Sequence, residues 1–283
     1  MRAAAAAVAP RTVPANAHRR RTLRGAHTTT HAYGTSDPTG TWTEKPQNAF
    51  GALITMAKGQ REVVQAGTPA LRNVAREVDP SRIDSGEIQE LIAEMTSVCR
   101  ARGVGLAAPQ LGTQLRVIVL EDTTEGMSDV SPGDRAAQRR EPFPMKVIIN
   151  PVLSPVGDAS AAFYEGCLSV GGYRAVVRRH LRVKCRGLGG DGSVVDFEAS
   201  GWMARILQHE VDHLNGVLYT DRMESRTFRR VDKINEPLPP DHPEFGPTVV
   251  LGESSIAPKS SAAAPLSADD LENRAKMGRR RKR

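Results

Sequence analysis

Residues 200–216 read SGWMARILQHEVDHLNG, a stretch that predicts one helix with two histidines on the same face. His209 and His213 are four residues apart, so both imidazoles project from one side of a helix and can bind a single cation. Glu210 follows the first histidine and can reach a water molecule beside that cation. The spacing is typical of metal-assisted hydrolysis.

Apolar residues cover most of this predicted helix, which begins after an N-cap at Ser200 and ends at Asn215-Gly216. Trp202 and Ile206 share the face of the histidines. An adjoining apolar stripe is formed by Met203, Leu207, Val211 and Leu214, which leaves only Ala204, Arg205, Gln208 and Asp212 for the outer face. A helix that is apolar around about two thirds of its circumference lies mostly inside a fold. A buried imidazole needs a partner, which favours metal ligation over two solvent-facing histidines.

The third ligand of a catalytic zinc-type site is a carboxylate, a histidine or a thiolate. Cys167 is our candidate because it lies in the polar, glycine-flanked segment YEGCLSV, residues 164–170. Cys99 lies on the apolar face of a predicted helix, and Cys185 alternates inward in a predicted strand, so both are predicted to pack in the core. Three cysteines in a chain of this length argue against a disulfide framework and indicate a reducing compartment.

A run of small residues, GVGLAAPQ at 103–110, supplies what a hydrolase still lacks. Its glycines allow the backbone to approach a ligand closely, and the Gln110 amide can donate a hydrogen bond to a developing oxyanion. Glycine pairs more often mark only a turn, so this segment carries weight only together with the other two.

GVGLAAPQ, EGCLS and QHEVDHLNG, in this order, resemble the three signature motifs of peptide deformylase, the metal enzyme that removes the formyl group from the initiator methionine of new polypeptides. The resemblance runs from about residue 60 to about residue 235, a length that suits a single domain. The stretch from Phe163 to His180 is most similar to the eukaryotic organellar subgroup called type 1A. The chain departs from the family pattern at Gly171 and Met203. These departures leave two properties undecided, the stiffness of the loop after Cys167 and the fine substrate preference.

The resemblance implies a role for each motif residue. Cys167, His209 and His213 would hold one divalent metal ion, Fe2+ or Zn2+. Glu210 would act as general base and then as general acid. Gln110 and the backbone N–H of Leu168 would stabilise the oxyanion.

The resemblance also implies how the substrate, an N-formylmethionyl peptide or nascent chain, is bound. The peptide would lie as an added strand along Val104, Gly105 and Gly166. The methionine pocket would be lined by Val104, Trp202 and Ile206. Glu165 would orient this region, or would only support neighbouring side chains or lie on the surface.

The two ends of the chain differ in composition from its middle. Residues 1–36 contain six arginines and no lysine or acidic residue, which is typical of a mitochondrial or chloroplast transit peptide, and we assign residues 1–58 to this segment. Residues 59–235 form the predicted catalytic domain. Residues 236–283 are predicted to be a disordered tail rich in proline, serine and alanine. The tail ends in RRRKR, which either contacts ribosomal RNA weakly or is a solvated charge run.

The net charge of +7 and the pI near 9.6 belong to these ends. Residues 1–45 carry +5 and residues 269–283 carry +4, which leaves −2 for the rest. We therefore expect no specific nucleic-acid binding by the catalytic domain. No stretch is long and apolar enough to span a membrane, and secretion is disfavoured because the apolar run after Arg2 is too short for a signal peptide.

The expected fold is α+β, with antiparallel sheets wrapped around the central ligand-bearing helix and an N-terminal helix near residues 85–100. Strands are expected at 115–120, 146–150, 181–186 and 194–199, with Asp191-Gly192 as a hairpin turn between the last two. Residues 122–145 are expected to be a surface loop. Two alternatives stay open: a metallopeptidase that uses Glu224 as third ligand, and a zinc-stabilised binding module without enzymatic activity.

Overall fold

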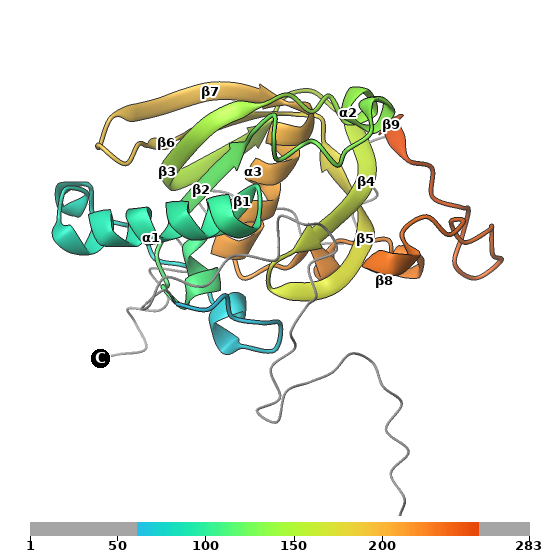
Figure 1. Cartoon of the computed structure of the whole chain (residues 1–283), viewed down its shortest axis with the longest axis horizontal. Coiled ribbons are helices and arrows are strands. Elements are labelled where there is room, and N and C mark those ends of the chain that lie inside the picture. The colour runs from blue at the N-terminus through green and yellow to red at the C-terminus, as the bar shows by residue number, and fades with distance from the viewer. Residues whose placement is uncertain (1–60, 255–283) are drawn as a thin grey trace, which may run out of the picture. The chain divides into compact units, whose positions relative to one another are not determined.

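The computed structural model describes residues 61–254. Its main feature is a pair of antiparallel sheets with one helix between them (Figure 1). The described residues all fall within one compact unit of the chain. Within residues 61–254 the three α-helices are α1 (Gly86–Arg102), α2 (Pro132–Gln138) and α3 (Gly201–Leu214). The described chain also contains short 3-10 helices at Pro69–Arg72, Pro80–Arg82, Ala108–Leu111 (η4), Tyr219–Asp221, Ser225–Thr227 and Val231–Lys233.

The larger sheet has the order β1-β2-β3-β6-β7, and the smaller has the order β8-β5-β4-β9. Every strand pair in both sheets is antiparallel. The larger sheet is formed by β1 (Gly105–Ala107), β2 (Val117–Asp122), β3 (Phe143–Pro155), β6 (Arg182–Leu188) and β7 (Val194–Ser200). The smaller sheet is formed by β4 (Ser160–Cys167), β5 (Val170–His180), β8 (Arg229–Arg230) and β9 (Gly252–Ser254).

Helix α3 lies between the sheets and contacts both of them (Figure 1). Its residues Ile206, Leu207 and Leu214 join a buried cluster with side chains of the larger sheet, including Ile118 and Ile148. The expected α+β fold with sheets around the motif-bearing helix is therefore confirmed.

Helix α1 confirms the helix predicted near residues 85–100. The Ser85 hydroxyl accepts a hydrogen bond from the backbone N–H of Ile88 at the N-terminus, and the helix ends before Gly103. Its buried face consists of Ile88, Leu91, Met95, Val98 and Cys99. This face packs on the larger sheet in a second buried cluster.

The strands predicted from apolar runs correspond to β2, β3, β6 and β7. The predicted hairpin turn is also present: the Gly189 N–H donates to the Ser193 carbonyl at 2.8 Å, and Gly192 has a φ of 77°. Glycine adopts this left-handed conformation without steric cost, which explains its place in the turn.

The predicted surface loop at 122–145 is wrong in part. It contains α2, which Ser131 caps, and β3 already begins at Phe143, a buried residue. Asp122, which is buried, and Arg140, which is partly buried, form an ion pair of 2.6 Å that joins the two ends of the segment. The many charged residues and prolines suggested exposure, whereas part of that charge is paired inside the fold.

The predicted boundary of the tail also needs correction. Residues 236–254 belong to the described structure, and β9 pairs with β4 through Ser160, Ala161 and Ala162. Arg139 forms an ion pair of 2.6 Å with Glu253 of β9. The predicted transit peptide and the basic end of the tail lie outside the described residues. Within 61–254, no helix is both long and apolar enough to cross a membrane.

Candidate active site

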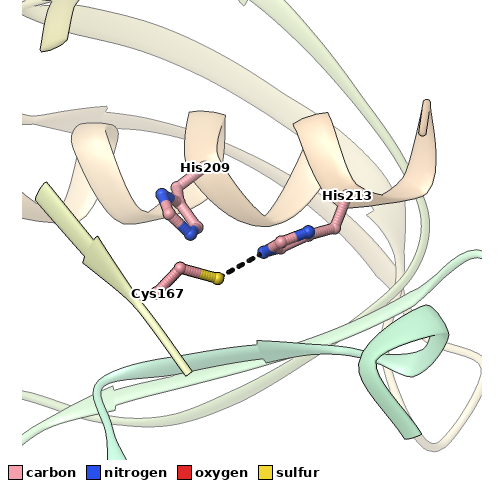
Figure 2. Close-up of side chains that lie close together, drawn as sticks. All are labelled: Cys167, His209 and His213. Atoms are coloured by element: carbon pink, nitrogen blue, oxygen red, sulfur yellow. Dashed lines mark hydrogen bonds between the residues drawn. The ribbon is translucent and has the colours of Figure 1, made fainter. Parts of the chain in front are cut away.

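Cys167, His209 and His213 meet between β4 and α3 (Figure 2). Their sulfur and nitrogen ligand atoms all lie within 4.8 Å of one another, and the Cys167 Sγ is 3.3 Å from the His213 Nε2. Both histidines are buried, and Cys167 is half-buried. One thiolate and two imidazoles form a donor set that fits a divalent metal ion with an open coordination position.

Each ligand is held by a local feature of its sequence. Cys167 ends β4, immediately before the turn Leu168-Ser169, and the pairing of β4 with β5 shifts register there. The backbone N–H of Ser169 donates to the Cys167 sulfur at 3.4 Å. The four-residue spacing in α3 places both imidazoles on the side of the helix that faces this turn (Figure 2).

The ends of α3 agree with the sequence in position. Ser200 is the N-cap, although its side chain makes no capping hydrogen bond, and Asn215 is the C-cap. Gly216 follows with a φ of 73°, and a Cβ there would lie 2.6 Å from the Arg72 carbonyl oxygen. Glycine is therefore needed both for the conformation and for this close approach.

Glu210 is buried beside the two histidines and against Gly105 of β1. A Cβ at Gly105 would lie only 2.3 Å from the Glu210 Oε1. The other oxygen, Oε2, makes no hydrogen bond to residues 61–254. Burial raises the pKa of Glu210 to about 7, so this carboxyl group can accept and release a proton near neutral pH.

Gln110 is buried in η4 with its amide in a fixed orientation. The Oε1 accepts a hydrogen bond of 2.9 Å from the backbone N–H of Ala107. The Nε2 therefore faces the other way, toward the Ser169 hydroxyl at 3.2 Å and the Cys167 sulfur at 3.6 Å. Leu168 lies in the turn next to this amide group, so both predicted oxyanion donors adjoin the cysteine.

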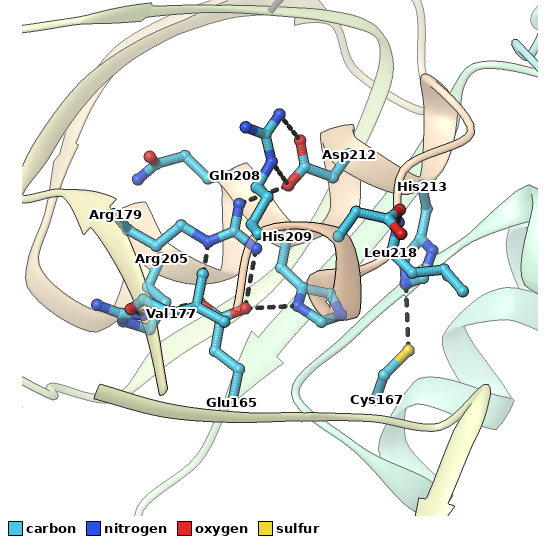
Figure 3. Close-up of polar contacts among 12 residues, drawn as sticks. Glu165, Cys167, Val177, Arg179, Arg205, Gln208, His209, Asp212, His213 and Leu218 are labelled. Carbon is cyan, nitrogen blue, oxygen red and sulfur yellow. Dashed lines mark hydrogen bonds and ion pairs between the residues drawn. The ribbon is translucent and has the colours of Figure 1, made fainter. Parts of the chain in front are cut away.

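A buried network of opposite charges surrounds the outer side of His209 (Figure 3). The Glu165 Oε2 lies 3.0 Å from the His209 Nδ1, and both carboxylate oxygens accept hydrogen bonds from Arg179. Arg205 adds a further bond of 2.7 Å to the Oε1. Burial would raise the pKa of Glu165, but the charges of Arg179 and Arg205 and the bond to His209 hold it well below its usual value.

Asp212 extends the network on the far side of Arg179 (Figure 3). It accepts a hydrogen bond from Arg179 and two more from Arg222, at 2.7 and 2.8 Å. The prediction that Arg205 and Asp212 lie on the outer face of the helix is therefore wrong. Both are buried because each is paired with opposite charge, which an apolar pattern does not reveal.

The predicted pocket residues come together in part. Val104, Trp202 and Ile206 belong to one apolar cluster, and the Arg140 guanidinium lies 4.8 Å from the centroid of the Trp202 ring. Gly105 adjoins Glu210 through β1, and Gly166 precedes Cys167 in β4. Glu165 differs, because its carboxylate points into the ion network and not toward an open surface.

Arg179 is the main residue that the sequence reasoning missed. The sequence carries little signal for it, because Ala175, Val176 and Val177 before it are all buried and no alternation of β5 marks Arg179 as an inward residue. A charged residue at an inward position of a strand needs a buried partner, and Glu165 supplies it at 2.8 Å.

Comparison with known proteins places this geometry in a family. The sequence model of the family described as "Polypeptide deformylase" matches residues 60–229. The chain is 50% identical over 186 residues to "Peptide deformylase 1A, chloroplastic" of Solanum lycopersicum, which covers 65% of this chain and 67% of the relative. It is 51% identical over 187 residues to "Peptide deformylase 1A, chloroplastic/mitochondrial" of Arabidopsis thaliana, with 66% and 70% covered.

A solved structure has the same fold. It is the Met-Ala-Ser-bound class I type b peptide deformylase from Acinetobacter baumannii, with a TM-score of 0.52 and 31% sequence identity. The match covers 59% of this chain and 100% of that chain.

The fold and the site define a hydrolase of the metal-dependent class, with a buried carboxylate beside two imidazoles and a thiol. The chain belongs to the peptide deformylase family, as the resemblance of its three motifs indicated. It removes the N-formyl group from newly made proteins, and the metallopeptidase alternative is not favoured. The organellar location predicted from the N-terminus agrees with the names of the two plant relatives, which are chloroplastic and chloroplastic/mitochondrial.

Proposed function

We propose that Cys167, His209 and His213 hold one divalent metal ion and that Glu210 carries the proton transfers of deformylation. The observation that supports this most strongly is the convergence of one sulfur and two imidazoles within 4.8 Å, next to a buried carboxylate. A divalent ion held there supplies a Lewis acid that lowers the pKa of water to about 7. Cys167 is then a ligand, and no covalent acyl-enzyme is expected.

Glu210 takes the proton of the attacking water and passes it to the leaving amine. Its Oε2 makes no hydrogen bond to residues 61–254, and its pKa of about 7 suits both steps. A group with a pKa near the working pH is the most effective general acid and base.

Gln110 and Leu168 stabilise the formyl oxygen as it becomes negative. The Gln110 Nε2 is directed toward Cys167 because its other end is fixed by Ala107. The backbone N–H of Leu168 lies in the adjoining turn. A donor of this kind contributes on the order of a hundredfold in rate.

Glu165 acts on the metal site through His209 and not on the substrate. A hydrogen bond from the His209 Nδ1 fixes the tautomer in which the Nε2 is free for a metal ion, and such partners typically change metal affinity by about 10–100-fold. The peptide itself adds to β1, an edge strand of the larger sheet, along Val104 and Gly105, and lies near Gly166. The methionine side chain enters the apolar cluster of Val104, Trp202 and Ile206.

The identity of the metal is Fe2+ or Zn2+, since both accept one thiolate and two imidazoles. Anaerobic and aerobic preparations of the protein, each with its metal content measured, separate the two. An iron enzyme loses activity in air as the metal and Cys167 oxidise, whereas a zinc enzyme keeps it.

The ends of the chain carry the remaining proposals. Residues 1–58 direct the protein to a mitochondrion or a chloroplast, and the catalytic domain begins near residue 59. The basic run at 279–283 either contacts ribosomal RNA or is solvated. Import of a fluorescent fusion into each isolated organelle tests the first proposal.

Release of formate from formyl-Met-Ala tests the proposed reaction. The unsubstituted chain should release formate, and Glu210→Ala should remain folded and metal-loaded with almost no turnover. Cleavage of an unstructured protein at internal bonds, without formate, would instead indicate a metallopeptidase. Full function of Glu210→Ala would indicate a zinc-stabilised binding module.

A further inference from the structure

We propose that Gln65 is a positioning residue for deformylation, because its side-chain amide holds the turn that carries Leu168. This inference rests on the proposed roles of Leu168 and Gln110. Gln65 belongs to residues 61–66, the segment that we call the N-terminal strap. The Gln65 Nε2 donates to the Leu168 carbonyl at 3.0 Å and to the Val63 carbonyl at 3.0 Å.

Two backbone hydrogen bonds of the strap reach the same catalytic segments. The Ala66 N–H donates to the Ser169 carbonyl at 2.7 Å, and the Val64 N–H donates to the Gln110 carbonyl at 2.9 Å. The strap therefore bonds to both residues of the β4–β5 turn and to the residue that supplies the second oxyanion donor.

The beginning of the strap is itself fixed. The Arg61 guanidinium binds Glu94 of α1 at 2.6 and 2.9 Å, and it also donates to the Thr113 hydroxyl and the Leu111 carbonyl. Val63 is buried in the cluster that includes Leu111, and Leu168 packs against that cluster. The strap thus joins α1 and the end of η4 to the turn after Cys167.

The turn benefits from this support because the pairing of β4 with β5 is irregular beside it. Gly166 pairs with Arg174, but Cys167 pairs with Val170, so the register shifts and residues 171–173 have no partner in β4. Gly171 and Gly172 are exposed, and glycine is the least restricted residue type. Fixing the carbonyl groups of Leu168 and Ser169 restricts the backbone torsion angles of the turn, including those of Leu168, and so limits how far the Leu168 N–H can swing.

Gln89 offers a matched control for a substitution of Gln65. Its Nε2 also donates to two backbone carbonyls, those of Ile83 at 2.9 Å and Gly190 at 2.8 Å. Both glutamines are exposed residues. Gln89 lies on α1 and its side chain bonds to neither η4 nor the β4–β5 turn. Gln89→Ala therefore also removes two side-chain bonds to backbone carbonyls, but it leaves the oxyanion donors unaffected.

The test compares kcat and KM for formyl-Met-Ala on the metal-loaded full chain. We expect Gln65→Ala to lower kcat about tenfold with little change in KM, less than the loss of a direct donor, because Gln65 acts through Leu168. Gln89→Ala should stay within about twofold of the unsubstituted chain, and Gln65→Lys, which keeps a donor of similar reach, should recover most of kcat. Equal kcat for Gln65→Ala and Gln89→Ala would overturn the inference.

Amide hydrogen exchange of residues 164–172 gives a second readout that does not require turnover. Gln65→Ala should speed exchange in this segment, and Gln89→Ala should not. Unchanged exchange in Gln65→Ala would also overturn the inference. Failure of the proposed function is separate, since it would appear as no formate release by the unsubstituted chain or as full kcat in Gln110→Ala.

Discussion

Replacing Gly105 by alanine should remove most of the activity while the fold and the metal ligands persist. The added Cβ would lie 2.3 Å from the Glu210 Oε1 and 2.8 Å from the Ile206 Cγ2. Ordinary contacts of a Cβ begin at 3.4 Å, so the Glu210 carboxylate must retreat by about 1 Å. Gly105 thus leaves the space that the general base occupies.

A displacement of this size is costly for catalysis and tolerable for stability. A shift of about 1 Å in a catalytic group can lower kcat by about a hundredfold, which corresponds to about 2.7 kcal/mol in the barrier. Overpacking costs the fold about 1–3 kcal/mol, and the atoms that must move are the ends of side chains rather than backbone.

Gly103→Ala is the matched control, two residues earlier in the same motif. A Cβ at Gly103 would have its nearest neighbour, the Leu168 Cδ1, at 3.5 Å, which is an ordinary contact. The assay is kcat for formate release at saturating formyl-Met-Ala, together with metal content and thermal unfolding. Should Gly105→Ala retain kcat within about threefold of Gly103→Ala, or lose its metal, the steric argument would be refuted.

Three further predictions concern single side chains of the site and the core. Glu210→Gln should keep its metal and lower the kcat for formate release by about 10²–10⁴-fold. A kcat above about a tenth of that of the unsubstituted chain would contradict the role of Glu210 in proton transfer. Glu165→Gln should bind its metal ion about 10–100-fold more weakly, measured by competition with a chelator. An unchanged metal affinity would show that Glu165 does not support the metal site. In the metal-free native protein at pH 7.5, iodoacetamide should alkylate Cys167 but neither Cys99 nor Cys185, because burial raises the pKa of both thiols to about 12 and keeps them protonated. Peptide mass mapping before and after unfolding in urea checks this, and rapid labelling of Cys99 would show that the core is open.

The metal-binding helix could be predicted because its signals are local. Two histidines four residues apart need no knowledge of the rest of the fold, and Asn215-Gly216 marks the end of α3 within a few residues. Cys167 could be placed with them only through the order of the three motifs, since it lies 46 positions before His213.

The ion network could not be predicted, because its partners are distant in sequence and follow no helical or strand period. Arg205 and Glu165 are 40 positions apart, and Arg179 and Asp212 are 33 positions apart. Each side chain alone resembles a solvated surface residue, and only the folded arrangement shows that the charges neutralise one another. The strands β4 and β5 were missed for a related reason, since glycines and arginines interrupt their apolar pattern.

The short strand β9 has a consequence for the solubility of the enzyme. It covers the side of β4 formed by Ser160, Ala161 and Ala162, far along the chain from the last motif residue. Without it, unpaired backbone amides and carbonyls would form an open template on which a second molecule could add a strand. A chain cut before residue 252 would therefore keep every group needed for chemistry and yet tend to self-associate.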